Sequence, residues 1–330
     1  MSRLASGARR VARACAGVLL STLILPAPGR AAELVLAVTH SPSSLAIDIA
    51  QEEGYFAAEG VALRIVDCAG GPRCMRQLFD GRAQLTAVSE LPVVFNSFER
   101  ADYTIVATLA TSTGNIKLIG RRSAGITGPQ QLAGKRIGVI IGSSSHYFLD
   151  AYLLFHGIDP KQVQIVAVQP EQMVAAVRHG QIDALAGYSR HTAAVAKALG
   201  EDAVALGDPR IYTDSFNLVV DRRTLGEREQ DIVRILRALQ RAQRFIAEHP
   251  QRAKQVLGAR ARLEPAFVET VFPAFSYRLS LDQSLVSTME SEARWALREG
   301  HIAPDRRLPN YLDYVATGPL LEAVPTALAQ

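Results

Sequence analysis

Short apolar runs alternate with longer amphipathic segments in the first third of the chain. The apolar runs cover residues 34–39, 61–66, 85–88 and 105–109. The segments between them, at residues 45–53, 75–79 and 93–98, are long enough for crossover helices. Strands and helices that alternate in this way predict a mostly parallel sheet with helices on both of its faces.

A second series of the same kind follows. Apolar runs at residues 137–141, 163–168 and 184–186 alternate with helical patterns at residues 146–155, 173–179 and 192–199. Extended segments lie before and after this series, at residues 116–121 and 216–221. The chain therefore contains two α/β units in tandem.

Beyond residue 221 the pattern is purely helical, and no strand-like run remains. The predicted helices cover residues 231–248, 253–257, 266–272, 281–298 and 311–315. We expect them to pack back onto the first unit, so that the second unit is an insertion.

The expected fold is α/β with two lobes, each a mixed, mostly parallel sheet flanked by helices. The first lobe combines residues 32–116 and 217–330, and the second lobe covers residues 117–216. Two crossover segments join them. Loops at the carboxyl ends of the strands then face a cleft between the lobes.

The N-terminus has the pattern of a secretory signal peptide. Four arginines precede an apolar run at residues 14–25 that is too short to span a bilayer. Small residues predict cleavage after Ala31, with Ala32 as the alternative. We therefore expect residues 1–31 to be removed and the protein to be exported.

Charge argues against a nucleic-acid partner. Residues 1–31 contain five arginines and no acidic residue, so the formal charge of +4 for the whole chain becomes −1 without them. A nearly neutral chain with interspersed charges offers no basic surface for a phosphate backbone.

Two cysteines remain beyond the signal, Cys68 and Cys74, and they flank a glycine-rich turn. In an oxidising compartment this pair favours a disulfide over a metal pair. Two free thiols are the alternative.

Three consecutive hydroxyl residues follow the predicted strand at residues 137–141. Gly142 ends the strand, and Ser143, Ser144 and Ser145 precede a helical pattern. A helix N-terminus carries free N–H groups and a partial positive charge, so this segment suits a small anion. Alternatively, one serine caps the helix and the others are surface residues.

Several motifs carry a resemblance to a known family. They are Gly54-Tyr55-Phe56, Glu59-Gly60-Val61, Gly70-Gly71 with Leu78 and Gly81, the run at 142–147, Gly157-Ile158, the run at 163–166, Gln169-Pro170, and Gly180 with Ile182 and Asp183. With the export signal and the two α/β units, they resemble the periplasmic substrate-binding proteins of ABC importers, in the NMT1/THI5-like group that binds sulfonates, nitrate and taurine.

The resemblance implies a function as well as a type II periplasmic-binding-protein fold. It implies a monomeric periplasmic receptor that binds a small organic anion, sulfonate- or taurine-like, without a cofactor. An ABC permease in the inner membrane would accept the anion, with its ATPase supplying the energy.

One segment of the chain departs from the pattern of this family. Where the sulfonate and taurine branches commonly have Trp near Pro, this chain has Gly187-Tyr188-Ser189-Arg190.

An oxyanion offers only acceptors, so its site needs hydrogen-bond donors. The candidate ligand-binding residues are Ser41, Ser43, Gly70, Gly71, Ser89, Glu90, Asn115, Ser143, Ser144, Ser145, His146, Tyr188, Arg190 and Asp214. Glu90 is expected to face a cation on the ligand if it lies near it.

Some of these residues have a second interpretation. Ser41 fits an N-cap before proline, Arg190 an exposed helix position and Glu90 a first-turn residue that complements the helix dipole. Asn115 and Asp214 lie near the crossovers and fit a hinge as well as a ligand contact. His146 fits a structural role better than that of a general base.

Catalysis finds little support. The chain has neither a Gly-x-Ser-x-Gly elbow nor a phosphate-binding lysine loop, and its seven histidines are scattered. We expect a receptor and not an enzyme. The alternatives are a periplasmic sensor for a signalling protein, and a receptor of the same fold for nitrate, an aromatic carboxylate or a thiamine pyrimidine precursor.

Overall fold

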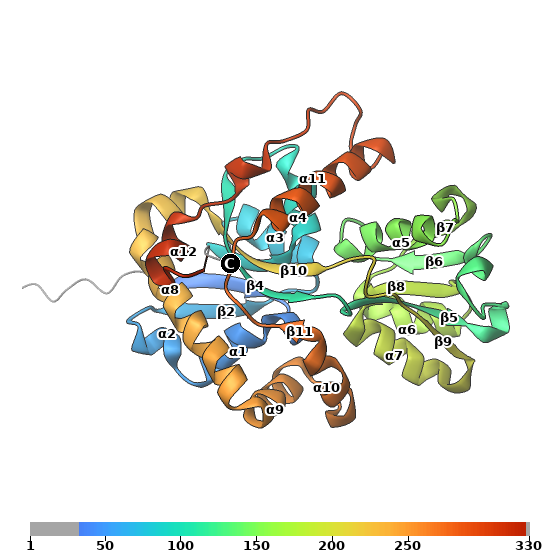
Figure 1. Ribbon diagram of the computed structural model, residues 1–330, viewed down its shortest axis with the longest axis horizontal. Coiled ribbons are helices and arrows are strands. Elements are labelled where there is room, and N and C mark those ends of the chain that lie inside the picture. The colour runs from blue at the N-terminus through green and yellow to red at the C-terminus, as the bar shows by residue number, and fades with distance from the viewer. Residues whose placement is uncertain (1–32, 328–330) are drawn as a thin grey trace, which may run out of the picture. The chain divides into compact units, whose positions relative to one another are not determined.

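The structure is a computed structural model that describes residues 33–327. The expected signal peptide, with its cleavage site at Ala31 or Ala32, lies outside the described residues. Two separate sheets organise the described part of the chain, one of six strands and one of five (Figure 1).

The six-stranded sheet has the order β11-β4-β10-β3-β1-β2. β1 is parallel to β2 and β3, whereas β10 is antiparallel to both β3 and β4. The strands are β1 (Leu34–Val38), β2 (Leu63–Asp67), β3 (Leu85–Ser89), β4 (Tyr103–Ser112), β10 (Asp214–Asp221) and β11 (Phe275–Ser276). We call this sheet and the helices packed on it the first lobe.

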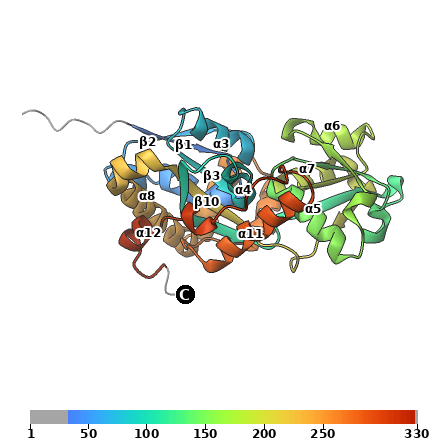
Figure 2. The ribbon, with the colours of Figure 1, turned by 90° about the horizontal axis from the view of Figure 1, so that it is seen from above.

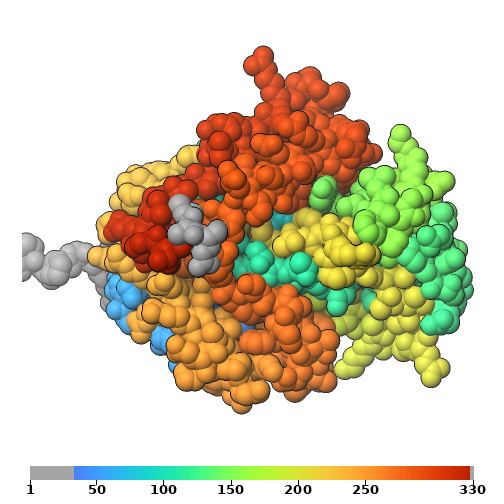
Figure 3. Space-filling view, in the orientation of Figure 1, coloured from blue at the N-terminus to red at the C-terminus, as the bar shows by residue number. Residues whose placement is uncertain are grey.

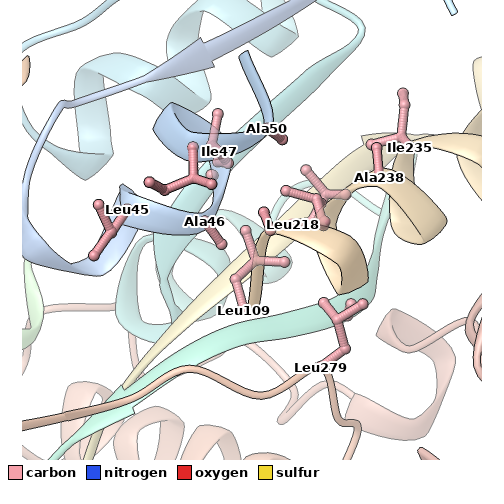
Figure 4. Close-up of a cluster of buried hydrophobic side chains, with 14 of the residues drawn as sticks. Leu45, Ala46, Ile47, Ala50, Leu109, Leu218, Ile235, Ala238 and Leu279 are labelled. Carbon is pink, nitrogen blue, oxygen red and sulfur yellow. The ribbon is translucent and has the colours of Figure 1, made fainter. Parts of the chain in front are cut away.

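Helices cover both faces of the first sheet (Figures 1 and 2). They are α1 (Leu45–Glu52), α2 (Tyr55–Ala58), α3 (Gly71–Phe79), α4 (Glu90–Ser97), α8 (Arg222–Glu248), α9 (Pro250–Ala261), α10 (Pro265–Val271), α11 (Gln283–Arg298) and α12 (Gly318–Ala323). Figure 4 shows α1 and α8 meeting over the sheet through Ile47, Leu218 and Ile235, which are all fully buried. On the other face α3, α4 and α11 bury a second cluster around Met75, Leu91 and Trp295.

The five-stranded sheet has the order β7-β6-β8-β5-β9. Its strands are β5 (Ile116–Arg121), β6 (Arg136–Val139), β7 (Gln164–Ala167), β8 (Ala184–Tyr188) and β9 (Ala203–Leu206). Its helices are α5 (Ser144–Phe155) on one face, and α6 (Met173–Arg178) and α7 (Ser189–Leu199) on the other. We call this sheet with its helices the second lobe.

Short 3-10 helices complete the two lobes. They are η1 (Pro42–Ser44), η2 (Arg122–Ala124), η3 (Pro129–Leu132), η4 (Pro160–Gln162), η5 (Pro170–Gln172), η6 (Gly200–Asp202), η7 (Phe272–Ala274) and η8 (Tyr311–Tyr314). The last of these occupies the segment expected to be a helix at residues 311–315.

Three sequence-based expectations about the strands were wrong. First, no strand was expected after residue 221, but β11 lies there and pairs with the end of β4. Residues 116–121 do not merely cross between the lobes, since β5 is hydrogen-bonded to β8 and β9 in the second sheet. β9 was not expected at all. β11 is too short, at two residues, to give a periodic pattern.

The chain crosses between the sheets twice, at residues 113–115 and 207–213, which separate β4 from β5 and β9 from β10. The first crossing begins beside the point where the second crossing ends, because Ser112 at the end of β4 pairs with Asp214 at the start of β10. In Figure 1 both pass between the first sheet and the second. Two short adjacent connections are the geometry of a hinge.

Candidate ligand-binding site

A cavity of about 440 Å³ lies between the two lobes. Nine of the fourteen predicted residues line it: Ser41, Ser43, Gly70, Gly71, Ser89, Asn115, Ser143, Tyr188 and Arg190. The other five, Glu90, Ser144, Ser145, His146 and Asp214, do not line it and are almost completely buried. The cavity is therefore lined largely by residues from the ends of strands in both lobes.

Four α-helices begin at the cavity. The residues that precede α3, α4, α5 and α7 all line it, and they are Gly70, Ser89, Ser143 and Tyr188. In the described structure none of them has a side-chain cap hydrogen bond to the helix that it precedes. Because each helix N-terminus carries roughly half a positive charge, their convergence makes the cavity favourable for an anion.

The serine run contributes a helix end and not three hydroxyl donors. The Ser143 Oγ donates to the carbonyl oxygen of Ile140 at 2.8 Å and lies 2.8 Å from the Ser145 Oγ. The Ser144 Oγ lies 3.4 Å from the Glu90 Oε1. The structure thus does not bring Ser144 and Ser145 to the cavity, because their side chains turn into the protein as α5 begins.

A buried polar network forms the floor of the cavity. Asp214 accepts hydrogen bonds from the Ser89 Oγ at 2.8 Å and from the Asn115 Nδ2 at 2.6 Å. The Asn115 Oδ1 in turn accepts from the Ser189 Oγ of the second lobe at 3.0 Å. Asn115 and Asp214 therefore tie the two crossings to the start of α7, and Asn115 also lines the cavity.

Glu90 is the first residue of α4 and lies behind this floor. Its Oε2 accepts hydrogen bonds from the backbone N–H of Ser215 at 3.1 Å and from the Ser215 Oγ at 2.6 Å. Burial, and secondly the nearby Asp214 carboxylate, raise the pKa of Glu90. Burial also raises the pKa of Asp214. Two further carboxyl groups are buried in the first lobe, those of Asp214 in β10 and Glu292 in α11, and sequence reasoning did not identify Glu292.

Arg190 lies in the first turn of α7 and reaches across the cavity. Its Nη1 donates to the backbone carbonyl of His40 in the first lobe at 2.8 Å. Among the described residues no carboxylate lies within ion-pair distance of its guanidinium, and burial lowers the pKa of Arg190. A half-buried cation without a counter-ion favours an anion in the same cavity.

The Cys68–Cys74 disulfide is present in the structure. It encloses the turn at Gly70, whose φ of +84° suits glycine, and the turn's N–H donates to the Thr39 Oγ1 at 3.0 Å. From this turn Arg73 reaches the second lobe, where its guanidinium donates to Glu171 at 2.9 Å and to Gln169 at 3.1 Å.

His146 lies away from the cavity, in agreement with the structural interpretation of this residue. Its ring lies 5.1 Å from that of Trp295 and 4.5 Å from that of His301. Neither ring nitrogen has a hydrogen-bond partner in the described part of the chain. Burial lowers the pKa of His146 to about 4, so the ring is neutral at physiological pH.

Sequence reasoning missed several charged residues of the cavity. His40 lies between Asp48 and Asp67, at 2.5 and 3.0 Å, and the hydrogen bond to Asp48 raises the pKa of His40. The sequence could have indicated His40 as a cavity residue, because it lies beside Ser41 directly after the first strand. Arg260 and Arg262 line the cavity from the end of α9, more than 200 residues along the chain from Ser41, and no local pattern marks them.

The described residues contain no group of three His, Cys, Asp or Glu side chains positioned to hold a metal ion. The described residues of the cavity wall offer hydrogen-bond donors and cationic side chains, which suit an anion and not a metal ion. Over the same residues, no helix combines the length and apolar character that a membrane span requires.

The two sheets, the paired crossings and the cavity between them define a periplasmic-binding-protein type of fold, which solved structures share. The alkanesulfonate-binding protein SsuA from Xanthomonas axonopodis pv. citri, bound to MOPS, superposes with a TM-score of 0.73 at 18% identity, over 87% of this chain and 100% of that one. The desulfurization enzyme DSZB has the same fold at a TM-score of 0.63 and 17% identity, over 89% of this chain and 99% of that one. At such identities the likeness concerns the fold alone.

Residues 41–253 match the family model described as NMT1/THI5 like, and this chain belongs to that family. The taurine-binding periplasmic protein of Escherichia coli is 28% identical over 202 residues, which cover 60% of this chain and 61% of that protein. A putative aliphatic sulfonates-binding protein of Bacillus subtilis is 25% identical over 245 residues, which cover 72% of this chain and 73% of that protein. The chain thus spans less than two thirds of the first of these relatives.

Proposed function

We propose that this protein is a periplasmic receptor that closes its two lobes on a small organic anion and delivers the anion to an ABC importer. The observation that carries the proposal is Arg190, a cation without a carboxylate partner among the described residues, in the wall of a cavity where four α-helices begin. A cavity of about 440 Å³ suits a small molecule.

The ligand class we propose is a sulfonate or a taurine-like compound. A sulfonate keeps its charge at physiological pH and only accepts hydrogen bonds, so it matches helix N-termini and a guanidinium. The names of the two relatives, a taurine-binding and an aliphatic sulfonates-binding protein, support this class. Nitrate, an aromatic carboxylate and a thiamine pyrimidine precursor remain as alternatives for the test below.

Delivery requires a moving part and a partner. We propose that the lobes, over residues 32–116 with 217–330 and over residues 117–216, rotate about the crossings as two bodies. The pairing of Ile116 with Tyr188 and of Asp214 with Ser112 supports moving the proposed boundaries by a few residues. The closed form would dock on an inner-membrane permease, whose ATPase supplies the energy, after export with cleavage near Ala31.

Two other functions share this fold. A sensor would use the same cavity, and its closed form would bind a signalling protein. Genes for a permease and an ATPase beside the gene of this protein would therefore favour import over sensing. An enzyme is the other alternative, because the desulfurization enzyme DSZB has this fold. We propose binding without catalysis, since Cys68, the one cysteine that lines the cavity among residues 33–327, is held in the disulfide.

Ligand screening of the exported protein tests the proposal. We expect thermal shift measurements to respond to taurine or alkanesulfonates among a panel that also holds nitrate, bicarbonate, aromatic carboxylates and pyrimidines. Calorimetry should then show binding at least about tenfold weaker in Arg190→Gln, because a hydrogen bond to a charged group contributes roughly 1.5–3 kcal/mol.

The matched control is Arg178→Gln, at the exposed end of α6 in the second lobe and outside the cavity, which should bind like the wild type. A response to neutral pyrimidines alone, or an Arg190→Gln variant with full affinity, would contradict the proposed receptor for anions.

A further inference from the structure

The cavity carries more positive charge than its own carboxylates balance. Two of its cationic groups already have partners. His40 lies between Asp48 and Asp67, and the Arg260 Nε lies 3.7 Å from the Asp48 Oδ1. The Glu171 carboxylate, which also lines the cavity, is paired with Arg73. These groups neutralise one another before any ligand enters.

Two further arginines lack such a partner. Over residues 33–327, the side chain of Arg190 in the second lobe hydrogen-bonds to the carbonyl oxygen of His40 and to no carboxylate. Arg262 in the first lobe is an exposed residue that lines the same cavity, and no carboxylate of the described residues lies within ion-pair distance of it. One unpaired guanidinium therefore comes from each lobe.

The backbone of Arg262 gives independent evidence that this side chain matters. Its φ and ψ are 54° and 52°, and it is the only residue other than glycine with positive φ among residues 33–327. It ends α9, at a position where glycine adopts the left-handed conformation without steric cost. An arginine that accepts this conformation beside a cavity indicates a functional reason for its side chain.

Part of the cavity wall is apolar and suits a short hydrocarbon segment. Val88, Ile140, Phe216 and Tyr188 line the same cavity as the two arginines. An apolar wall with a cation from each lobe matches a molecule with an acidic group at each end and a few methylene groups between them.

We propose that the ligand is an organic dianion with two separate acidic groups, such as a sulfonate that also bears a carboxylate, and that Arg190 and Arg262 each bind one of them. This inference rests on the proposed receptor function and narrows its ligand class. Closure on a dianion would balance one uncompensated charge in each lobe, whereas a monoanion would leave one guanidinium unpaired.

A matched pair of probes tests the inference. 3-Sulfopropanoate and propane-1-sulfonate share the sulfonate and differ by a carboxylate in place of a methyl group. Calorimetry should show that the sulfopropanoate binds at least about tenfold more tightly. In Arg262→Gln this preference should fall to about twofold or less, with the affinity for the monoanion nearly unchanged.

Arg262→Gly separates folding from binding. Glycine relieves the left-handed backbone, so this variant should melt no lower than the wild type and still lose the preference for the sulfopropanoate. Arg178→Gln again serves as the control in the second lobe.

The outcomes are distinguishable. If propane-1-sulfonate binds as tightly as 3-sulfopropanoate, the inference is wrong and the anion receptor stands. If propylphosphonate, measured in alkaline buffer where both of its charges lie on one group, binds more tightly than the sulfopropanoate under the same conditions, the two acidic groups are not separate. If no anion of the wider panel binds, the proposed function fails and the inference with it.

Discussion

Glu90 shows how a single carboxyl can couple this structure to pH. It is fully buried at the junction of the lobes, between Ser215 of the first lobe and Ser144 of the second. Burial and the Asp214 carboxylate raise its pKa, and the charge of Glu90 contributes to raising the pKa of Glu292. The folded protein therefore holds a proton here that an unfolded chain releases near pH 4.

We predict that the stability of the protein falls as the pH rises through the raised pKa of Glu90. An acid with a raised pKa in the folded state stabilises fully below its unfolded pKa and loses that contribution at higher pH, by at most about 1.4 kcal/mol per pH unit for one proton. In Glu90→Gln, which stays neutral, this slope should be smaller, and the part that remains comes from Asp214 and Glu292, whose pKa values burial also raises.

Denaturant unfolding of both proteins between about pH 5 and 9 measures the difference. Glu201→Gln, at an exposed acid of the second lobe, should keep the wild-type slope. Parallel curves for the wild type and Glu90→Gln would show that Glu90 does not hold the proton.

The sequence could predict residues whose role is local. Ser143 follows a strand and precedes a helix, and the structure places it there as the N-cap that lines the cavity. It could not predict which hydroxyls turn inward, because a helix rotates each successive residue by 100° and the packing of α5 against α4 decides which side is buried. Arg260 and Arg262 reach the cavity through the tertiary fold alone.

At the scale of elements, the disulfide-linked turn before α3 contributes to both sides of the cleft. Gly70 and Gly71 line the cavity, while Arg73 crosses to Gln169 and Glu171 beside η5. The disulfide between Cys68 and Cys74 limits the motion of this turn. The turn therefore holds Arg73 where it can keep the two lobes together.

We predict that Arg73→Ala speeds ligand release. The pair with Glu171 is exposed, with 44% and 57% of the two side chains accessible, so its contribution is of the order of 0.2–1 kcal/mol. Dissociation rates measured by stopped flow should rise by about one and a half to fivefold. Salt should reduce the difference, since it screens exposed charges.

Arg76→Ala, an exposed arginine of the same helix, is the control for this experiment. Equal release rates for the Arg73→Ala variant and the wild type at low salt would mean that the contact does not hold the lobes together.

Elements with a clear apolar run or helical period were predictable, whereas the short edge strands β9 and β11 were not. The parallel strands β1, β3, β6 and β8 have continuous apolar runs because both faces of their sheets are covered. β11 is stabilised by pairing with β4 and not by its own composition. In α8 the expected start at residue 231 follows a kink, since Arg228 has non-helical angles and the helix extends back to Arg222.

At the scale of the whole molecule, the lobes contact each other on more than one side. The Trp295 Nε1 of α11 donates to the Asp150 Oδ2 of α5 at 2.8 Å, away from the cavity. Figure 3 shows α11 and the segment after it, in orange to red, on the surface of the first lobe. Contacts of the cavity-lining residues, such as Arg190 with His40, differ from this one because they must break to admit a ligand.

We predict that ligand binding makes the protein more compact. A ligand that touches both lobes binds the closed arrangement better and shifts the population towards it. Small-angle scattering of the exported protein should show a smaller radius of gyration with saturating ligand than without it. The Arg190→Gln variant needs more ligand for the same change, and an unchanged radius in the wild type would contradict hinge closure.

The strand order of the first sheet also has a consequence for the way the chain reaches this structure. β10 lies between β3 and β4, so the contact of Glu90 with Ser215 joins residues 125 positions apart. The second sheet, by contrast, forms from an unbroken stretch between Ile116 and Leu206. Distant pairings close slowly, because the entropy of a long loop must be lost first. A chain synthesised from its N-terminus therefore keeps its first hundred residues without the central strand β10 until Asp221 has emerged. Such a delay would favour the export that we propose, because only an extended chain can be threaded through a membrane pore.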